Sequence, residues 1–166
     1  MAAARSAANF FNTGKGRYLL LAARLILGGV FLYAAYAKLH LDGQWHLGDY
    51  NFLFALAIDS YQMLPLWLVR WMALILPWLE IALGALLILG VGLRWVSLAM
   101  SALLLVFMIA LARAALLHLE INCGCFGYGS VTPRTELLHD SVFMGLSLAL
   151  TAGAFLSYRA RRAQRL

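Results

Sequence analysis

Two cysteines, Cys123 and Cys125, stand one residue apart in the segment Ile121-Asn122-Cys123-Gly124-Cys125-Phe126-Gly127, and the chain has no others. Gly124 permits the backbone turn that a disulfide between such close neighbours requires. Strain in so small a ring should make the bond easier to reduce than a long-loop structural disulfide, which suits a disulfide that is exchanged. In an oxidising compartment the pair is therefore a candidate for reversible thiol chemistry.

Two other interpretations of the cysteines remain open. The pair could staple a glycine-rich loop or stay inert, although closing so short a loop removes little entropy from the unfolded chain. It could also join His118 and a methionine around a soft ion such as Cu(I), but one Cys-x-Cys with one histidine is an incomplete ligand set. No second cysteine pair is present for a structural zinc site, so no metal site is predicted.

Charged residues inside apolar stretches are costly and therefore candidates for function. Arg113 and Lys38 fall on the same side of the chain's apolar stretches as the cysteines, where a positive charge would favour the reactive thiolate. His118 is a candidate proton shuttle. An apolar pocket between helices near Glu80 would be the place for a quinone ring. The alternative is that Glu80, Arg113 and Asp140 are paired charges that fix helix register.

Composition shows which elements must position these residues. The chain has 166 residues, of which 64% are hydrophobic and 12% charged, with a mean hydropathy of +0.83, so too few polar side chains exist to cover a soluble globule. We predict an all-α membrane protein, a four-helix bundle without a soluble enzyme domain. The membrane domain covers residues 18–157, with spans at about 18–38, 66–91, 95–117 and 135–157, flanked by basic segments 1–17 and 158–166.

The connections between these spans carry further expectations. The apolar segment from Asn51 to Met63 is too short to cross a membrane, so we predict an interfacial or re-entrant helix in the first loop. A fifth span there would move the carboxyl terminus to the other side. The short turn at 90–94 predicts that the second and third spans are antiparallel neighbours. Glycines at positions 28, 29, 84 and 145 are expected to permit close helix contact.

Basic residues set the predicted orientation. They cluster before the first span, in the 90–94 turn and after the last span, which places both termini in the cytoplasm and the cysteine loop 118–134 outside. The first span superficially resembles a signal peptide, but it is over-long, contains Arg24 and is followed by further spans, so no cleavage is expected. Arg24 is interpreted as snorkelling toward the cytoplasmic interface. The net charge of +6 does not indicate nucleic-acid binding, because the charges lie at the ends of spans.

Three segments together resemble a known family. Cys123-Gly124-Cys125-Phe126-Gly127, the stretch Arg24-Leu25-Ile26-Leu27-Gly28 leading to Lys38-Leu39, and Pro77-Trp78-Leu79-Glu80-Ile81-Ala82-Leu83-Gly84 are similar to the MauE branch of the MauE/DoxX family of redox-associated membrane proteins. The resemblance covers about residues 17–157. It implies a four-helix protein of the bacterial inner membrane linked to periplasmic thiol chemistry, accompanied by a thioredoxin-like partner and supporting maturation of a disulfide-rich dehydrogenase subunit. More distant DoxX/DoxD relatives are associated with quinone-linked oxidation. Where the family pattern has an Arg-Asp or Arg-Asn pair in the fourth span, this chain has His139-Asp140.

The function predicted from these observations is thiol/disulfide exchange. Cys123 and Cys125 would exchange a disulfide with a periplasmic thioredoxin-like partner, assisted by Arg113 and His118, which would make the chain a thiol-disulfide oxidoreductase. A quinone near Glu80 is a candidate electron acceptor. The alternative is a non-catalytic subunit or assembly factor of a larger membrane redox complex, in which the cysteines are structural.

Overall fold

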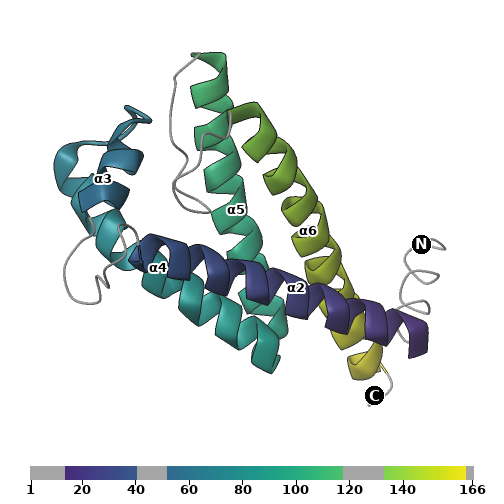
Figure 1. Ribbon diagram of the computed structural model, residues 1–166. Coiled ribbons are helices and arrows are strands. Elements are labelled where there is room, and N and C mark those ends of the chain that lie inside the picture. Colours follow the sequence, from purple (N-terminus) through teal and green to yellow (C-terminus); the bar gives the residue numbers. More distant parts are fainter. Residues whose placement is uncertain (1–13, 41–51, 118–132, 164–166) are drawn as a thin grey trace.

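The computed structural model describes residues 14–40, 52–117 and 133–163, and within these ranges its regular structure is entirely helical. Figure 1 labels the helices as α2 (Gly14–Leu39), α3 (Phe52–Asp59), α4 (Leu66–Leu89), α5 (Leu93–Leu116) and α6 (Pro133–Ala163). Four of them, α2, α4, α5 and α6, are long and apolar enough to cross a membrane. The predicted all-α, four-span membrane fold is therefore confirmed, and the eight-residue α3 is too short to cross.

The four long helices form two pairs. α2 packs chiefly against α4, and α5 packs chiefly against α6. Figure 1 shows the two pairs spreading apart with distance from the α4–α5 turn, so that α3 and the far end of α5 lie on opposite arms. α4 and α5 do contact each other, as their short turn predicts, but less extensively than each contacts its main partner.

The α4–α5 turn depends on two glycines. Gly90 ends α4 with a φ of 77° and donates its backbone N–H to the carbonyls of Leu86 and Leu87, and Gly92 precedes α5 with a φ of 58°. Both are left-handed conformations, which glycine adopts without the Cβ penalty of other residues. Arg24 of α2 donates from Nε to the Leu87 carbonyl at 3.0 Å and from Nη2 to the Ile88 carbonyl at 2.9 Å.

Arg24 thereby gives the Ile88 carbonyl a donor and adds a second donor to the Leu87 carbonyl, which also accepts from Gly90, at the end of α4 where carbonyls lack the usual helical partners. Its guanidinium is partly buried. The structure thus gives Arg24 a specific contact with α4, beyond the snorkelling inferred from its position in the sequence.

Close approach of α2 and α4 occurs at Gly28 and Gly84. A Cβ added to Gly28 would lie 2.5 Å from Cγ1 of Ile88, and one added to Gly84 would lie 2.9 Å from the carbonyl oxygen of Gly28. Small residues allow transmembrane helices to gain packing contacts at short range. The expectation of close contact is confirmed for these two glycines, whereas an added Cβ at Gly29 or Gly145 meets nothing within 4 Å.

Hydroxyl groups join α5 to α6. The Ser101 and Ser147 hydroxyls lie 2.7 Å apart, and Ser101 also donates to the Ser97 carbonyl at 2.9 Å. Thr151 donates to the Ser147 carbonyl at 2.9 Å. Because buried polar groups in an apolar surrounding need partners, these bonds specify how the two helices face each other.

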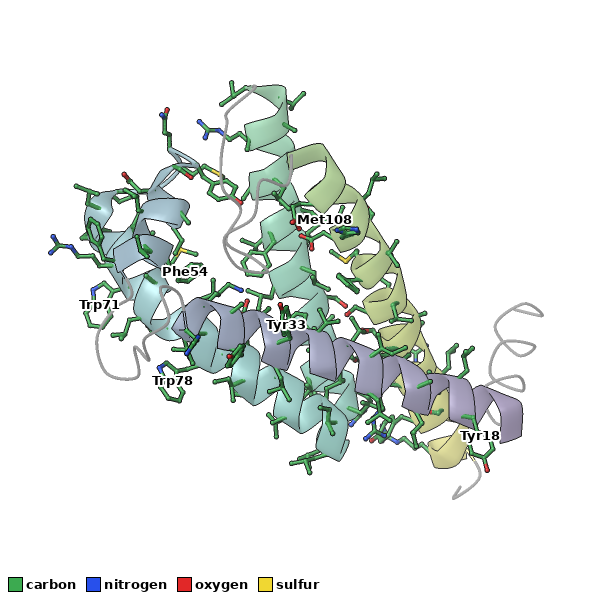
Figure 2. The ribbon with its side chains drawn as sticks, viewed as in Figure 1. Tyr18, Tyr33, Phe54, Trp71, Trp78 and Met108 are labelled. Carbon is green, nitrogen blue, oxygen red and sulfur yellow. The ribbon has the colours of Figure 1, made fainter. Side chains whose placement is uncertain are left out.

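Apolar side chains form two buried clusters. The larger cluster draws on all four long helices and contains Ala23, Leu27, Phe31, Leu83, Leu87, Val96, Met100, Leu104 and Leu150. The smaller cluster joins α3 to the first half of α4 through Phe54, Ala55, Val69, Ala73 and Leu76. Many large apolar side chains remain on the surface, as Figure 2 shows for Tyr18, Trp71 and Trp78, which is expected of helices whose solvent is lipid.

Candidate functional site

A buried ion pair lies in the interior of the bundle. Lys38, in the last turn of α2, places its ammonium 2.8 Å and 2.9 Å from the two carboxylate oxygens of Glu80 on α4. Both side chains are only 2% exposed. The ammonium also lies 5.7 Å from the ring centre of Phe54 and 6.0 Å from that of Phe107, within range of cation–π attraction. Lys38 thus connects α2 with α3, α4 and α5.

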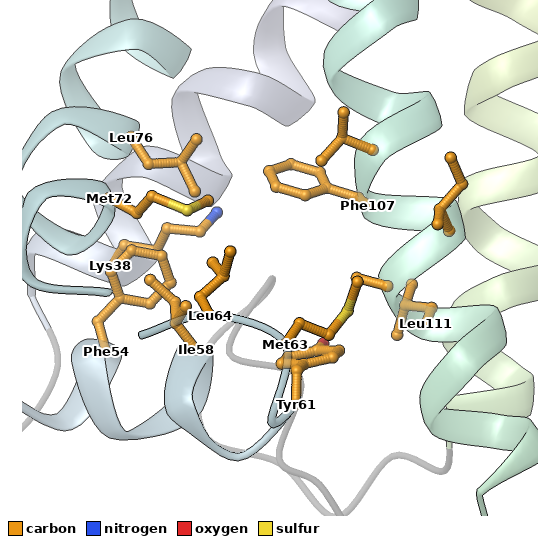
Figure 3. Close-up of a pocket in the computed structure, with 13 residues that line it drawn as sticks. Lys38, Phe54, Ile58, Tyr61, Met63, Leu64, Met72, Leu76, Phe107 and Leu111 are labelled. Atoms are coloured by element: carbon orange, nitrogen blue, oxygen red, sulfur yellow. The ribbon is translucent and has the colours of Figure 1, made fainter. Parts of the chain in front are cut away.

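A pocket of about 250 Å³ lies on one side of Lys38, between α3, α4 and α5. Figure 3 shows the Lys38 amine at its inner end, with Phe107 across from the methionine and leucine side chains of α4. Apart from Lys38 and Tyr61 the lining is apolar: it includes Phe54, Ile58, Met63, Leu64, Met72, Leu76 and Leu111. The pocket therefore combines an apolar wall with one cationic group.

A smaller cavity of about 30 Å³ lies between α2, α4, α5 and α6. Three ionisable side chains line it, Lys38, Glu80 and Asp140, while Phe107 is shared with the larger pocket. Asp140 of α6 is 5% exposed, and its Oδ2 has no hydrogen-bond partner in the structure. Glu136, one turn earlier on α6, is also 5% exposed with an unpartnered Oε2. The interior therefore holds two further carboxyls beyond the one that Lys38 neutralises.

Arg113 connects α5 to the segment between α3 and α4. Its Nη1 donates to the backbone carbonyls of Tyr61, at 2.8 Å, and Gln62, at 3.3 Å. Gln62 has a φ of 50°, in the left-handed region that few residues other than glycine adopt. Tyr61 lines the larger pocket, so Arg113 holds one wall of that pocket in place.

The predicted site residues fall into two groups. Cys123, Cys125 and His118 lie outside the described residues. Glu80 lines the smaller cavity and contacts the larger pocket only through Lys38. Arg113 lies beside that pocket, and its effect on the thiols stays a prediction.

The structure specifies which charges are paired. The sequence leaves Glu80, Arg113 and Asp140 as a set of paired charges, but Glu80 pairs with Lys38 and Arg113 binds backbone carbonyls. The sequence position of Lys38 indicates only that it lies near the outward-facing end of the predicted spans. The signal for its role is that a carboxylate inside a span requires a nearby cation, and Lys38 is one of few basic residues within or beside the spans.

Comparisons with known proteins agree with this architecture. Residues 16–155 match the family described as "Methylamine utilisation protein MauE". A "Methylamine utilization protein MauE" of Paracoccus denitrificans is 33% identical over 138 residues, which cover 81% of this chain and 69% of that protein. A protein of the same name from Methylorubrum extorquens is 32% identical over 99 residues, 59% of this chain and half the length of that relative. No solved structure matches the chain.

The match to the family extends from the first turns of α2 nearly to the end of α6 and so includes both cavities and the buried ion pair. The chain, with four helices able to span a membrane, therefore belongs to the MauE family.

Proposed function

We propose that this protein is a thiol/disulfide redox protein of the bacterial inner membrane, in which Cys123 and Cys125 form a reversible disulfide. Its partner would be a thioredoxin-like protein outside the cytoplasm, and its task the oxidative maturation of a disulfide-containing protein there. The observation that carries this proposal is the Cys-Gly-Cys sequence, in a MauE-family chain, in the connection between α5 and α6.

The exchange proceeds through sulfur chemistry with a complete electron balance. A thiolate of the reduced partner attacks one sulfur of the Cys123–Cys125 disulfide, which forms a mixed disulfide and releases the other cysteine as thiolate. The partner's second thiolate then breaks the mixed disulfide. The partner leaves oxidised, and the Cys123–Cys125 pair has gained two electrons and, once both thiolates are protonated, two protons.

The connection that carries the cysteines begins near the larger pocket. Leu111 of α5 lines the pocket, and α5 ends at Leu116, so the connection starts within about two helical turns of the pocket wall. Arg113 lies between Leu111 and the end of α5 and contacts the pocket wall at Tyr61. This position supports its predicted role in favouring the thiolate of a nearby cysteine, because a cation within about 4–6 Å favours the charged form.

Reoxidation of the reduced pair requires an acceptor of two electrons and two protons, and a lipid-soluble quinone would supply that capacity. The larger pocket fits such a ring: its volume of about 250 Å³ exceeds the ~150 Å³ of a cavity that accepts benzene. Phe54, Phe107 and Met72 would contact the ring, with the Lys38 ammonium at the inner end. Glu80, predicted to be near the quinone, would act by holding Lys38.

The experiment compares the wild type with Cys123→Ser, Cys125→Ser and the cysteine-free double variant. Free thiols are counted by maleimide–polyethylene glycol labelling, before and after reduction, on membranes from cells with an oxidising periplasm. We expect wild-type protein to accept label at both cysteines only after reduction. Purified reduced thioredoxin lacking its resolving cysteine is the defined partner, and it should form a mixed disulfide with the wild type.

Each alternative gives a different result. A pair that is oxidised in cells but not reduced by intact thioredoxin is a structural staple. A pair that stays fully reduced in the oxidising compartment, with no mixed disulfide, contradicts the proposal. Full support of partner maturation by the double variant would show instead a non-catalytic subunit or assembly factor. The double variant also controls for labelling that does not depend on cysteine.

A further inference from the structure

We propose that the smaller cavity is an internal proton-binding site, in which Asp140 carries an exchangeable proton and Glu136 conducts it between the cavity and the end of the bundle where α6 begins. This function goes beyond thiol exchange and does not depend on the cysteines. The argument rests on charge balance, cavity volume and the positions of the two carboxyls on α6.

Charge balance is the first step. The Lys38 ammonium contacts both carboxylate oxygens of Glu80, so this pair is neutral as a unit. Asp140 adds a second carboxyl to the same cavity, and Lys38 is the only cationic side chain among the residues that line it. A charged carboxylate buried without its own partner costs several kcal/mol, whereas a bound proton removes that charge.

The cavity is large enough for one water. A volume of about 30 Å³ exceeds the roughly 10–15 Å³ that one water requires. The ammonium of Lys38 and the carboxyls of Glu80 and Asp140 line it, so a water there has polar partners on three helices. Water in this position joins Asp140 to the ion pair and gives its proton a mobile acceptor.

Glu136 provides the connection to the helix end. It precedes Asp140 by four residues, and positions four apart lie on the same face of a helix. α6 begins at Pro133, so Glu136 is in the first turn and Asp140 in the second. Both carboxyls are 5% exposed and both have an oxygen without a hydrogen-bond partner. Two protonatable groups thus follow each other from the helix end to the interior.

The groups that face Asp140 come from each neighbouring helix. α2 contributes Lys38 and α4 contributes Glu80, whereas the α5 residues that line the cavity, Leu104 and Phe107, do not titrate. On α6 itself, Glu136 and the exposed His139 interact electrostatically with Asp140. Within the described residues no group of three His, Cys, Asp or Glu side chains could hold a metal ion. A buried carboxyl next to an ion pair that is already neutral is a group that can bind a proton.

Infrared spectroscopy of the full-length protein in lipid nanodiscs tests the site directly. Protonated carboxylic acids absorb at a C=O stretching frequency separate from the carboxylate bands. The chain has seven acidic residues, and exposed ones are ionised at neutral pH, so the band reports on buried acids. We expect the wild type to show this band at about pH 6, where exposed carboxyls are still ionised, to shift it when H₂O is replaced by D₂O, and to lose it at alkaline pH.

Variants assign the band. Asp140→Asn should remove the part of the band that comes from Asp140. Asp140→Glu, which keeps a carboxyl, should retain this part and change its frequency. Glu136→Gln should retain it but slow its hydrogen–deuterium exchange about 100-fold, the lower end of what a positioned proton-transfer group contributes. Asp59→Asn, on α3 and outside the residues lining the cavity, is the matched control and should leave band and exchange unchanged.

Several results would overturn the proposal. A wild-type spectrum without a protonated-carboxyl band at about pH 6 would exclude a bound proton. A band unchanged in both Asp140 variants would place that proton elsewhere. A band insensitive to D₂O would show a carboxylic acid whose proton does not exchange with solvent. Wild-type exchange in Glu136→Gln would refute the conducting role of Glu136. Because no cysteine takes part in these measurements, their failure leaves the thiol proposal intact, and the converse also holds.

Discussion

Lys38 and Glu80 form the buried ion pair in the interior of this protein. Each side chain is 2% exposed, and the two are in direct contact as an ion pair. A buried ion pair seldom exceeds a well-packed apolar pair in stability, so its presence is weak support for a purely structural role. Its position between the two cavities instead supports a role in what those cavities bind.

Replacing Glu80 by Gln should destabilise the protein by up to about 3–5 kcal/mol, because Lys38 would lose the carboxylate that it contacts directly and would keep only Asp140 as a carboxyl in the same cavity. Lys38→Met should also destabilise it, and the Lys38→Met, Glu80→Gln double variant should lose less than the sum of the two. Unfolding in mixed micelles, followed by circular dichroism against increasing denaturing detergent, gives the three free energies. Asp59→Asn serves as the control, with an expected change within about 0.5 kcal/mol. Additive losses would mean that the ion pair contributes no coupling.

At the scale of the elements, contact between α2 and α4 depends on two glycines that face each other. The backbone carbonyl oxygen of Gly28 lies 2.9 Å from the position of a Cβ on Gly84, and the Ile88 side chain lies 2.5 Å from the position of a Cβ on Gly28. The ion pair joins the same two helices, so their separation also affects the distance from Lys38 to Glu80. Packing and charge pairing are therefore coupled along this interface.

Gly84→Ala should destabilise the α2–α4 interface by about 1–3 kcal/mol, the usual cost of overpacking, because the clash is with backbone and cannot be relieved by a rotamer change. Gly28→Ala should cost somewhat less, since its shortest contact is with the Ile88 side chain, which can move partly aside, and the Gly84 carbonyl oxygen, at 3.0 Å, is its next contact. The matched controls are Gly29→Ala and Gly145→Ala, where an added Cβ meets nothing within 4 Å. These should be neutral or slightly stabilising, because alanine favours helix over glycine. The same detergent-unfolding assay measures all four, and equal losses at all four sites would refute packing as the cause.

Viewed as a whole molecule, the protein has its pockets where the two helix pairs spread apart. α2 with α4 and α5 with α6 are each closely packed, while α3 packs on α4 and the larger pocket lies between α3, α4 and α5, next to Lys38. Arg113 ties the α3–α4 segment on one side of this space to α5 on the other. The arrangement leaves a site between the pairs whose walls come from three different helices.

Both termini should lie in the cytoplasm, with the cysteine loop outside. An even number of spans puts the two chain ends on one side, and the basic residues before Tyr18, at Arg94 and from Arg159 onward favour the cytoplasm for that side. Reporter fusions before Tyr18, after Tyr158 and at Gly129 measure the three locations. Activity of a periplasmic reporter at the carboxyl terminus would contradict this topology, whereas a cytoplasmic reporter active before Tyr18 serves as the internal control.

The sequence alone was sufficient for the number of spans, the short helix before Pro65 and the family. Length and hydropathy are properties of each segment by itself, so four apolar stretches predict four helices without knowledge of their neighbours. The glycine contact at Gly28 and Gly84 was also expected from residue type. The role of Asp140 beside the ion pair could not be derived in this way, because it comes from a different helix than either Lys38 or Glu80.

Only the tertiary structure determined which helices pair and which charges meet. In a membrane the lipid is as apolar as a helix interface, so hydrophobic periodicity does not distinguish a lipid-facing side from a partner-facing one. Lys38 and Glu80 are 42 residues apart, and Glu80 could have met Arg113 or another cation equally well on sequence grounds. Their pairing follows from the short distance between α2 and α4 that the two glycines permit, and it leaves Arg113 for the backbone of the α3–α4 segment.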